Sequence, residues 1–351
     1  MQSRVLQGEP FVEVTRAETV ESVHRGAACA VDSRGAVIAA VGEIDVPVYL
    51  RSAAKPFIAA AAIAAGARER FGLQPQEIAV MAASHSGEAF HVNAVRSILQ
   101  KIGLDEHALQ CGAHAPYNAQ AALDLERAGL PFTALHNNCS GKHAGILALC
   151  LLLGADPATY LDARNPAEAA ILAFCARLSG ERVEDLALGI DGCGIPVYAT
   201  PLRNAALSFM RFATLEGVSD EDARALEIVR SAMIAHPAYV SGTGEFDTQL
   251  MNVTEGALCC KGGAEGVHAD AAIGAGVGFV LKMADGSSRG RGPATIASLQ
   301  GLGLLDGPQA AALAEFAHPI VYNRAGRAVG EIRVVRSTIA VLKAGINEDL
   351  V

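Results

Sequence analysis

A serine and a lysine spaced for nucleophilic catalysis lie at Ser52 and Lys55, in the run Ser-Ala-Ala-Lys. Residues three apart share one face of a helix, so the lysine amine can reach the serine hydroxyl. A serine needs a base, and a lysine can act as one where burial or nearby positive charge lowers its pKa. The apolar neighbours Ala53, Ala54 and Phe57 could supply that desolvation. Because S-x-x-K is common by chance, the spacing by itself indicates only a candidate Ser–Lys pair.

A second cluster of polar side chains reads Ser-His-Ser-Gly-Glu and directly follows the apolar run Ile78–Ala83. An active-site loop at the end of an element would have this pattern. Ser84 or Ser86 could be a nucleophile there, with His85 as its base. The alternative is an ordinary helix start, in which a serine caps the helix and Glu88 completes a capping box.

The third cluster, His136–Gly145, packs five functional polar residue types directly before the apolar helix Ile146–Leu153. Burying so many polar groups costs free energy unless they are paired or bound to something. Cys139 and His143 are four residues apart and share one helical face, which makes them a possible metal-ligand pair. A second thiol, Cys193, lies in a glycine-flanked turn. Two cysteines with an amine or imidazole would suit zinc, although the spacing matches no standard finger; the alternative is two buried thiols in a polar hinge.

Two later segments carry further polar groups beside glycines. Lys261 lies on a predicted strand in the run Cys-Lys-Gly-Gly, where a ligand could lie against the backbone. It could serve as a second amine for a serine or bind a carboxylate. The run Ser241–Asp247, Ser-Gly-Thr-Gly-Glu-Phe-Asp, is the other segment.

A predicted hairpin followed by a helix must position the first Ser–Lys pair. Glu21–Glu43 contains two short β runs around Asp32–Gly35, a typical hairpin pattern. The alanine-rich stretch that follows predicts a helix that begins near Ser52. Pro56 suits its first turn, and Gly72 marks its C-terminal stop.

The middle of the chain is predicted to be mostly helical, and the last third to return to strands. Gln76–Ala83 is predicted to be a helix or a buried segment. The predicted helices that follow it are Phe90–Ile102, Ala119–Ala128, Gly141–Leu153, Pro166–Leu178, Leu202–Leu215 and Asp220–His236. The last third is predicted to contain strands at Cys260–His268, Ala271–Asp285 and Ala328–Arg336 and helices at Pro293–Leu304 and Gln309–Phe316. This order predicts an α/β fold of the α+β type, as a single domain over residues 1–351. A central antiparallel sheet from about residues 10–50 and 240–351 is flanked by helices, with a helical subdomain over about 52–238.

Composition places the chain among globular proteins that act in water. Of its 351 residues, 51% are hydrophobic and 19% charged, which excludes a disordered chain. The most apolar stretch, Ile58–Ala65, is far shorter than a membrane span of about 20 residues. The net charge of −9, with no basic stripe, argues against a nucleic-acid partner. Eight irregularly spaced cysteines, and no secretory signal at Met1–Pro10, lead us to expect a cytoplasmic protein with free thiols.

Taken together, the motifs resemble known families. A Ser-x-x-Lys after a hairpin, a middle serine loop and a late Lys-Gly-Gly strand resemble the order in serine β-lactamases and penicillin-recognising enzymes. The phrases LRSAAKPF, ASHSGE-x-F-H, HNNCSGKHAG, DGCGIPVYA and CKGGAEG resemble more narrowly the Rhizobium etli-type L-asparaginases. The resemblance extends from about Glu21 to Arg336. It implies a β-lactamase-like fold, a homodimer, and hydrolysis of L-asparagine to L-aspartate and ammonia.

The same resemblance implies roles for individual residues. Ser52 with Lys55 would form one Ser–Lys pair and Ser84 with Lys261 a second, with Ser52 the favoured nucleophile in an acyl transfer. The zinc ligands implied by the motifs are Cys139, Lys142 and Cys193. The expected substrate-binding residues are Arg51, His143 and Asp191, of which His143 and Asp191 orient either the substrate or the shell around the metal. Zn²⁺ would position the α-amino and carboxylate groups of the substrate. The glutaminase-like relatives and β-lactamases lack the two cysteines, which favours the narrower assignment.

Two other interpretations remain open from the sequence. One is a related serine amidohydrolase that acts on glutamine or on β-lactams. The other is a non-catalytic protein that binds zinc or an amino acid and whose serines only cap helices. The complete set Ser52, Lys55, Ser84 and Lys261 favours an active enzyme.

Overall fold

The computed structural model describes residues 5–344. The chain forms two compact units, and each is described by itself. Unit 1 comprises Met1–Ala53, Thr200–Thr214 and Val253–Val351, and unit 2 comprises Ala54–Ala199 and Leu215–Asn252. Among the described residues, no helix is both long and apolar enough to pass through a lipid bilayer.

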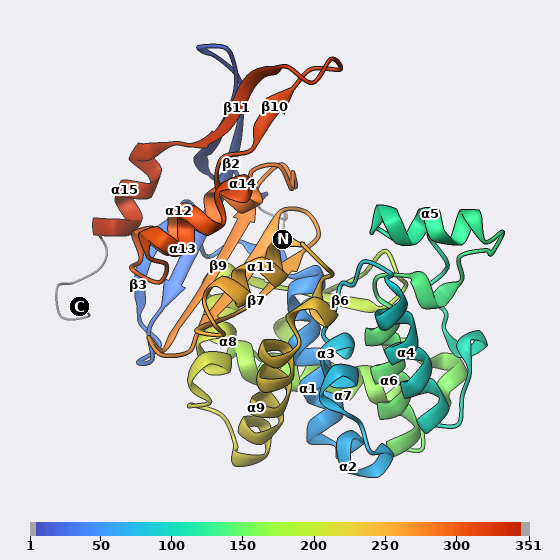
Figure 1. The fold of residues 1–351 in the computed structure, drawn as a ribbon. Helices are drawn as coiled ribbons and strands as arrows, with labels where there is room; N and C mark the ends of the chain where they lie inside the picture. The colour runs from blue at the N-terminus through green and yellow to red at the C-terminus, as the bar shows by residue number, and fades with distance from the viewer. Residues whose placement is uncertain (1–4, 345–351) are drawn as a thin grey trace. The chain divides into compact units, whose positions relative to one another are not determined.

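Unit 1 is built on a curled antiparallel sheet to which both ends of the chain contribute. Its strands are β1 (Glu9–Arg16), β2 (Thr19–Val31), β3 (Val37–Val41), β7 (Leu258–Gly263), β8 (Val267–Ala272), β9 (Val277–Met283), β10 (Ile320–Tyr322) and β11 (Ala328–Val334). The strand order is β10-β11-β1-β2-β9-β8-β7, and β3 pairs with β2 beside this path. In Figure 1 the blue N-terminal strands and the red C-terminal strands lie side by side, which confirms the sheet predicted from both ends of the chain.

The predicted hairpin is present. β2 and β3 pair with Ala30 opposite Ala39. The Asp32 carboxylate accepts hydrogen bonds from the backbone N–H groups of Arg34 and Ala36, both at 3.0 Å. A carboxylate that satisfies turn amides in this way is the reason that an Asp-Ser-Arg-Gly run closes a hairpin.

The prediction for the C-terminal strands was partly wrong. A turn at residues 264–266 interrupts the expected strand Cys260–His268, and a turn at residues 273–276 interrupts the expected strand Ala271–Asp285. Three strands, β7, β8 and β9, therefore form where two were expected. The strands β1 and β10 were not predicted, because β1 alternates only weakly and β10 is three residues long.

Helices flank this sheet. They are α8 (Leu202–Thr214), α12 (Arg291–Gly301), α13 (Gly307–Ala312), α14 (Ala314–Ala317) and α15 (Arg336–Ala344). α8 packs so closely on β9 that a Cβ at Gly278 would lie 2.1 Å from the carbonyl oxygen of Ala206. The helix predicted over Gln309–Phe316 is divided into α13 and α14.

Unit 2 is largely helical, as predicted. Its helices are α1 (Lys55–Ala64), α2 (Ala67–Phe71), α3 (Pro75–Met81), α4 (Ala89–Lys101), α5 (Ala119–Arg127), α6 (Ser140–Leu152), α7 (Pro166–Ser179), α9 (Asp220–Ala235), α10 (Pro237–Val240) and α11 (Phe246–Val253). The short strands β5 (Ala187–Ile190) and β6 (Pro196–Pro201) pair antiparallel.

The alanine-rich helix α1 is the centre of unit 2 and packs against α6, α7 and α9. Every residue from Lys55 to Ile63 is buried, so small side chains allow neighbouring helices to approach from all sides. The prediction of one helix reaching Gly72 was wrong. Gly66, at φ +91°, ends α1 early, and α2 follows as a separate helix that stops at Gly72.

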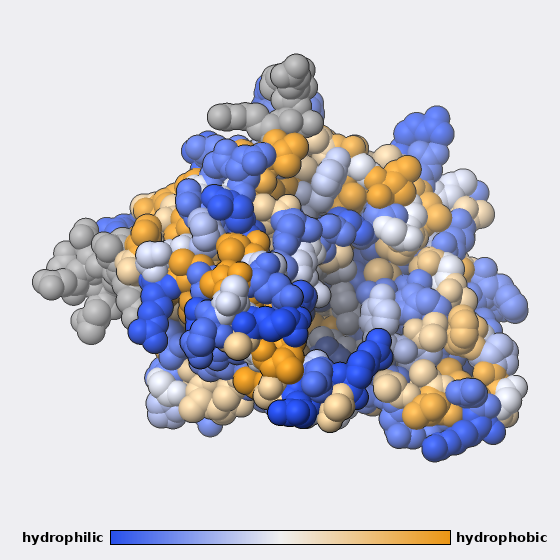
Figure 2. Space-filling view, turned by 90° about the horizontal axis from the view of Figure 1, so that it is seen from above, coloured by the Kyte–Doolittle hydropathy of each residue, from blue (hydrophilic) through white to orange (hydrophobic). Residues whose placement is uncertain are grey.

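Many of the apolar residues that make up the composition are buried inside the protein. Figure 2 shows that the visible face carries apolar side chains in small groups among hydrophilic ones. Apolar area of this scattered kind is normal for a protein surface.

Candidate functional site

The loop that carries Ser84 begins where α3 ends. α3 stops at Met81, and the chain then runs without regular secondary structure to Glu88, the residue directly before α4. The backbone N–H of Ser84 donates to the carbonyl of Val240 at 3.0 Å, which fixes the loop. The hydroxyl of Ser84 accepts a hydrogen bond from Lys55 Nζ at 3.0 Å.

Lys55 is a fully buried amine, with 1% of its surface exposed. Its Nζ also donates to the carbonyl oxygen of Ala83 at 2.7 Å. Burial is the main cause that lowers the pKa of Lys55, and the positive charge of Lys142 adds to it, while the sulfurs of Cys139 and Cys193 act in the opposite direction. An amine with a lowered pKa can give up its proton and act as a general base.

Ser52 and its neighbour Arg51 lie in unit 1, on a short 3-10 helix over Arg51–Ala54. Arg51 has φ +52°, a conformation that costs a non-glycine residue free energy and that clusters at functional sites. Ser52 is half-buried. The expected pairing of Ser52 with Lys55 stays a prediction, and the hydrogen bond from Lys55 Nζ shows that Ser84 also contacts this amine.

Lys261 lies on β7 of the same unit, opposite Ala269 of β8. It is buried, and its Nζ donates to the carbonyl oxygen of Gly262 at 2.7 Å. A Cβ at Gly263 would lie 2.8 Å from the carbonyl oxygen of Leu50 and 3.2 Å from the Ala53 nitrogen. The glycine therefore lets the end of β7 run directly against the turn that carries Ser52.

Two thiols and an amine converge at the start of α6. Lys142 Nζ donates to Cys193 Sγ at 2.9 Å, and the two cysteine side chains are hydrogen-bonded to each other. All three side chains are buried. Asp191 Oδ2 lies 4.0 Å from Lys142 Nζ. The residues that sequence motifs implied as zinc ligands, Cys139, Lys142 and Cys193, are thus brought together by the fold.

The side chains of Cys139, Lys142 and Cys193 shift one another's pKa values. The hydrogen bond from Cys193 lowers the pKa of Cys139 well below its usual range, against the effect of burial and with help from Lys55 and Lys142. The pKa of Cys193 is raised by the same hydrogen bond and by burial. Burial lowers the pKa of Lys142, but Cys139, Cys193 and Asp191 outweigh it and raise the pKa overall. A thiolate, a thiol and an ammonium group therefore meet here, and they would become a sulfur and nitrogen donor set of the kind that zinc prefers once Cys193 and Lys142 release their protons to a binding ion.

His143 has a different environment from the one its spacing suggested. Its Nδ1 is 2.6 Å from the hydroxyl of Tyr160, which itself accepts from the N–H of Gln110 at 2.7 Å. The tyrosine proton is therefore directed at Nδ1. Nε2 of His143 is buried and has no hydrogen-bond partner within the described part of the chain. Lys142, and not His143, is the residue of this turn that contacts the Cys193 sulfur.

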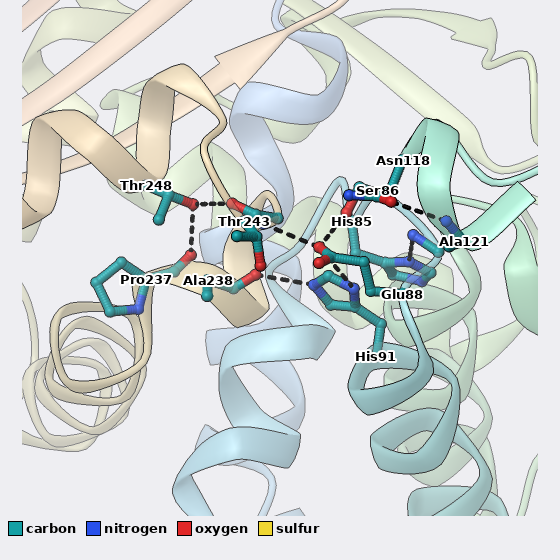
Figure 3. Close-up of polar contacts among 12 residues, drawn as sticks. His85, Ser86, Glu88, His91, Asn118, Ala121, Pro237, Ala238, Thr243 and Thr248 are labelled. Carbon is teal, nitrogen blue, oxygen red and sulfur yellow. Dashed lines mark hydrogen bonds and ion pairs between the residues drawn. The ribbon is translucent and has the colours of Figure 1, made fainter. Parts of the chain in front are cut away.

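Sequence reasoning missed how Glu88 joins two loops (Figure 3). Glu88 Oε2 accepts from the Ser86 hydroxyl at 2.7 Å and from the backbone N–H of Thr243 at 2.9 Å. Glu88 is itself the residue before α4, so the capping box suggested for it was wrong. Gly242, at φ +139°, leaves room for Ser86, because a Cβ there would lie 2.2 Å from Ser86 Oγ. The Ser-Gly-Thr-Gly run was the available signal for this contact.

Comparison with known proteins adds the following. The family model for L-asparaginase II matches residues 12–334. Crystal structures that match part of this chain include Mglu in its native form, at 16% identity over 81% of this chain and 66% of that chain, with a TM-score of 0.45. Another is Mglu in the presence of 4.3 M NaCl, at 19% identity over 81% and 62%, with a TM-score of 0.46. This chain therefore spans about two thirds or less of the length of those two proteins. No match was found among curated proteins.

Proposed function

The chain belongs to the L-asparaginase II family, and on that premise we propose that it hydrolyses the side-chain amide of L-asparagine to L-aspartate and ammonia. The observation that carries the proposal is a buried amine, Lys55, within hydrogen-bond distance of a serine hydroxyl, Ser84. An amide hydrolase needs a nucleophile and a group that moves its proton, and these two side chains have that chemistry.

The proposed reaction is an acyl transfer. The hydroxyl oxygen of Ser52 attacks the amide carbon, its proton passes to the neutral amine of Lys55, and backbone N–H groups near Ser52 stabilise the oxyanion. The C–N bond then breaks, and the leaving nitrogen takes a proton and departs as ammonia. Water hydrolyses the aspartyl ester and restores the serine. Ser84 with Lys261 forms the second Ser–Lys pair, and its contact with Lys55 makes Ser84 the alternative nucleophile.

We also propose that Cys139, Lys142 and Cys193 hold Zn²⁺. The support is the donor set described above, in which Cys139 has a lowered pKa and is therefore ready to bind as a thiolate. When bound, the ion would supply a positive centre that positions the amino and carboxylate groups of the substrate. Asp191 and His143, beside this centre, and Arg51 are the proposed substrate-binding residues.

Three broader expectations remain part of the proposal. The antiparallel sheet flanked by helices supports a β-lactamase-like fold. The eight cysteine side chains are all buried, and thiols at these positions fit a reducing cytoplasm. The family resemblance supports a homodimer, which light scattering on the purified protein would test.

Ammonia release tests the function directly. The purified enzyme, loaded with Zn²⁺, is offered asparagine, glutamine and nitrocefin in parallel. Ammonia release is measured for asparagine and glutamine, and opening of the β-lactam ring is measured for nitrocefin by the change in its absorbance. Faster hydrolysis of asparagine than of the other two supports the proposal, and no ammonia release from asparagine contradicts it. Preference for glutamine or nitrocefin would instead assign a related serine amidohydrolase.

Trapping the acyl-enzyme identifies the nucleophile. Mass spectrometry of the quenched enzyme is expected to place the adduct on Ser52 in the wild type and to find none in Ser52→Ala. Ser84→Ala is the matched variant, and it should still form the adduct. An adduct on Ser84 would overturn the assignment of Ser52.

A further inference from the structure

Two hydrogen bonds connect the Ser84 loop with the start of α6, and both are made by His85. The backbone N–H of His85 donates to the carbonyl of Asn138 at 3.2 Å. The ring Nε2 of His85 lies 2.8 Å from the hydroxyl oxygen of Ser140. The side chains of His85 and Ser140 are both fully buried.

The directions of these bonds are fixed by their partners. The backbone N–H of Gly87 can only donate, and it points to His85 Nδ1 at 3.2 Å, so Nδ1 is an acceptor. Burial, with the nearby His91 and Lys55, lowers the pKa of His85 well below its ordinary value, so the ring is neutral. Its one proton is therefore on Nε2 and is donated to Ser140. Ser140 passes its own proton on to the carbonyl of Leu135, at 2.9 Å.

This arrangement excludes one chemical role and suggests another. A histidine that donates to a serine cannot take the proton of that serine, so His85 and Ser140 are no base–nucleophile pair. His85 directly follows Ser84, and Ser140 directly follows Cys139. The chain of hydrogen bonds thus joins the residue that Lys55 contacts to the turn that carries the thiol–amine cluster.

We propose that His85 and Ser140 form a positioning pair, which holds the Ser84 loop in register with the turn of Cys139 and Lys142. The inference rests on the proposed function, because it gives the pair its purpose: to keep a serine at a fixed distance from the group that binds the substrate. Displacements of about 1 Å at such a distance can cost about 100-fold in rate.

Two substitutions of His85 separate the two ends of its ring. His85→Asn keeps an acceptor near the position of Nδ1 but cannot reach Ser140. His85→Gln is longer, and its amide N–H can take the place of Nε2–H. We expect His85→Asn to lose about 10- to 100-fold in kcat with little change in KM, and His85→Gln to retain kcat within about threefold of the wild type.

A double-mutant cycle tests the pair itself. Ser140→Ala should reproduce the loss in His85→Asn, and the double variant should be no slower than either single variant. Additive losses, or a Gln variant as slow as the Asn variant, would overturn the proposal. If His85 were a general base, the Gln variant would lose about 10²- to 10⁴-fold, and the pH–rate profile would lose a limb.

Measuring the folded fraction of each variant separates a positioning role of His85 and Ser140 from a role in stability alone. kcat is expressed per folded enzyme, with thermal unfolding measured for each variant. A rate loss that disappears after this correction would mean that the pair only stabilises the fold, which overturns the positioning role.

One readout does not depend on the reaction. Long-range ¹H–¹⁵N NMR of the histidine-labelled wild type should show the ring of His85 neutral, with its proton on Nε2, from about pH 5 to 8. A proton on Nδ1 would overturn the inference even in an active enzyme. A wild type that releases no ammonia but shows this tautomer would contradict the proposed function alone.

Discussion

At Gly141, in the first turn of α6, substitution by alanine is expected to destabilise the protein, which is the opposite of its usual effect inside a helix. Glycine inside a helix is usually improved by alanine, by about 1 kcal/mol, because alanine loses less backbone entropy. At Gly141 a Cβ would lie 2.1 Å from the carbonyl oxygen of Val80 and 2.7 Å from its carbonyl carbon. Both are backbone atoms of α3, so no side-chain rotation can remove the overlap.

The size of the penalty follows from the distance that must be recovered. Carbon–oxygen contacts of this kind ordinarily lie at about 3.3 Å or more, so α6 must move away from α3 by about 1 Å. Overpacking that forces backbone shifts costs up to about 3 kcal/mol. After the helix-propensity gain is subtracted, we expect Gly141→Ala to destabilise unit 2 by about 2 kcal/mol. Because Lys142 is the next residue, the same shift should lower kcat.

A matched control lies one turn further along the same helix. At Gly145 the nearest atom to a new Cβ is the terminal methyl of Met81, at 2.8 Å, and that flexible side chain can move. Urea unfolding and ammonia release are measured for both variants. Gly141→Ala should be clearly less stable and slower than Gly145→Ala. A Gly141→Ala protein as stable as the wild type would refute the reasoning, because it would show that α3 and α6 are not held in contact.

Three further predictions follow from buried groups. Lys55→Arg should lose at least about 100-fold in kcat, measured by ammonia release, because a guanidinium keeps its charge and cannot accept the serine proton; near-normal activity would exclude Lys55 as the base. Cys139→Ser should lose bound zinc by elemental analysis, whereas Cys150→Ser, within the helix α6 that Cys139 precedes, should keep it, and full metal content in the first would remove Cys139 from the ligand set. Burial raises the pKa of Glu168 to about 8, so the folded protein keeps a proton that the unfolded chain releases, and stability should fall as the pH rises from about 4.5 to 8. Glu168→Gln should flatten this profile in urea unfolding and stabilise the protein by up to about 4 kcal/mol at pH 8, and an unchanged slope would show that Glu168 does not titrate in this range.

The elements with strong local patterns were predictable from the sequence. The hairpin at Asp32–Gly35 is closed by its own side chain, and the helices of unit 2 have marked starts, such as Asn118 at α5 and Asn165 at α7. What could not be predicted depends on contacts distant in the chain. β10 is only three residues long and exists because β11 pairs with it, and Gly66 divides α1 from α2 through a left-handed backbone that alanine-rich surroundings conceal.

In the site, too, features set by neighbouring residues were predictable, and contacts between residues far apart in the sequence were not. Spacing predicts that Cys139 and His143 share a helical face. It cannot show that the ring of His143 is hydrogen-bonded to the hydroxyl of Tyr160, or that Lys142 is the residue that contacts Cys193. These contacts join residues up to about fifty positions apart, and no local pattern encodes them. The family resemblance supplied Lys142, and the physical reason for it, a buried amine on a thiol, emerges only from the fold.

The sequence motifs around the site contain glycines as well as polar residues, because the backbone must come close to neighbouring segments there. Gly141 brings α6 onto the backbone of Val80, Gly242 makes room for Ser86, and Gly263 brings β7 onto Leu50. In each case a Cβ would overlap with an atom of a segment that carries or adjoins a proposed site residue. Backbone contacts vary less than side-chain contacts, because they involve no rotamers. The polar residues therefore need these glycines beside them to reach their positions, and a motif reduced to its polar residues alone would not build the site.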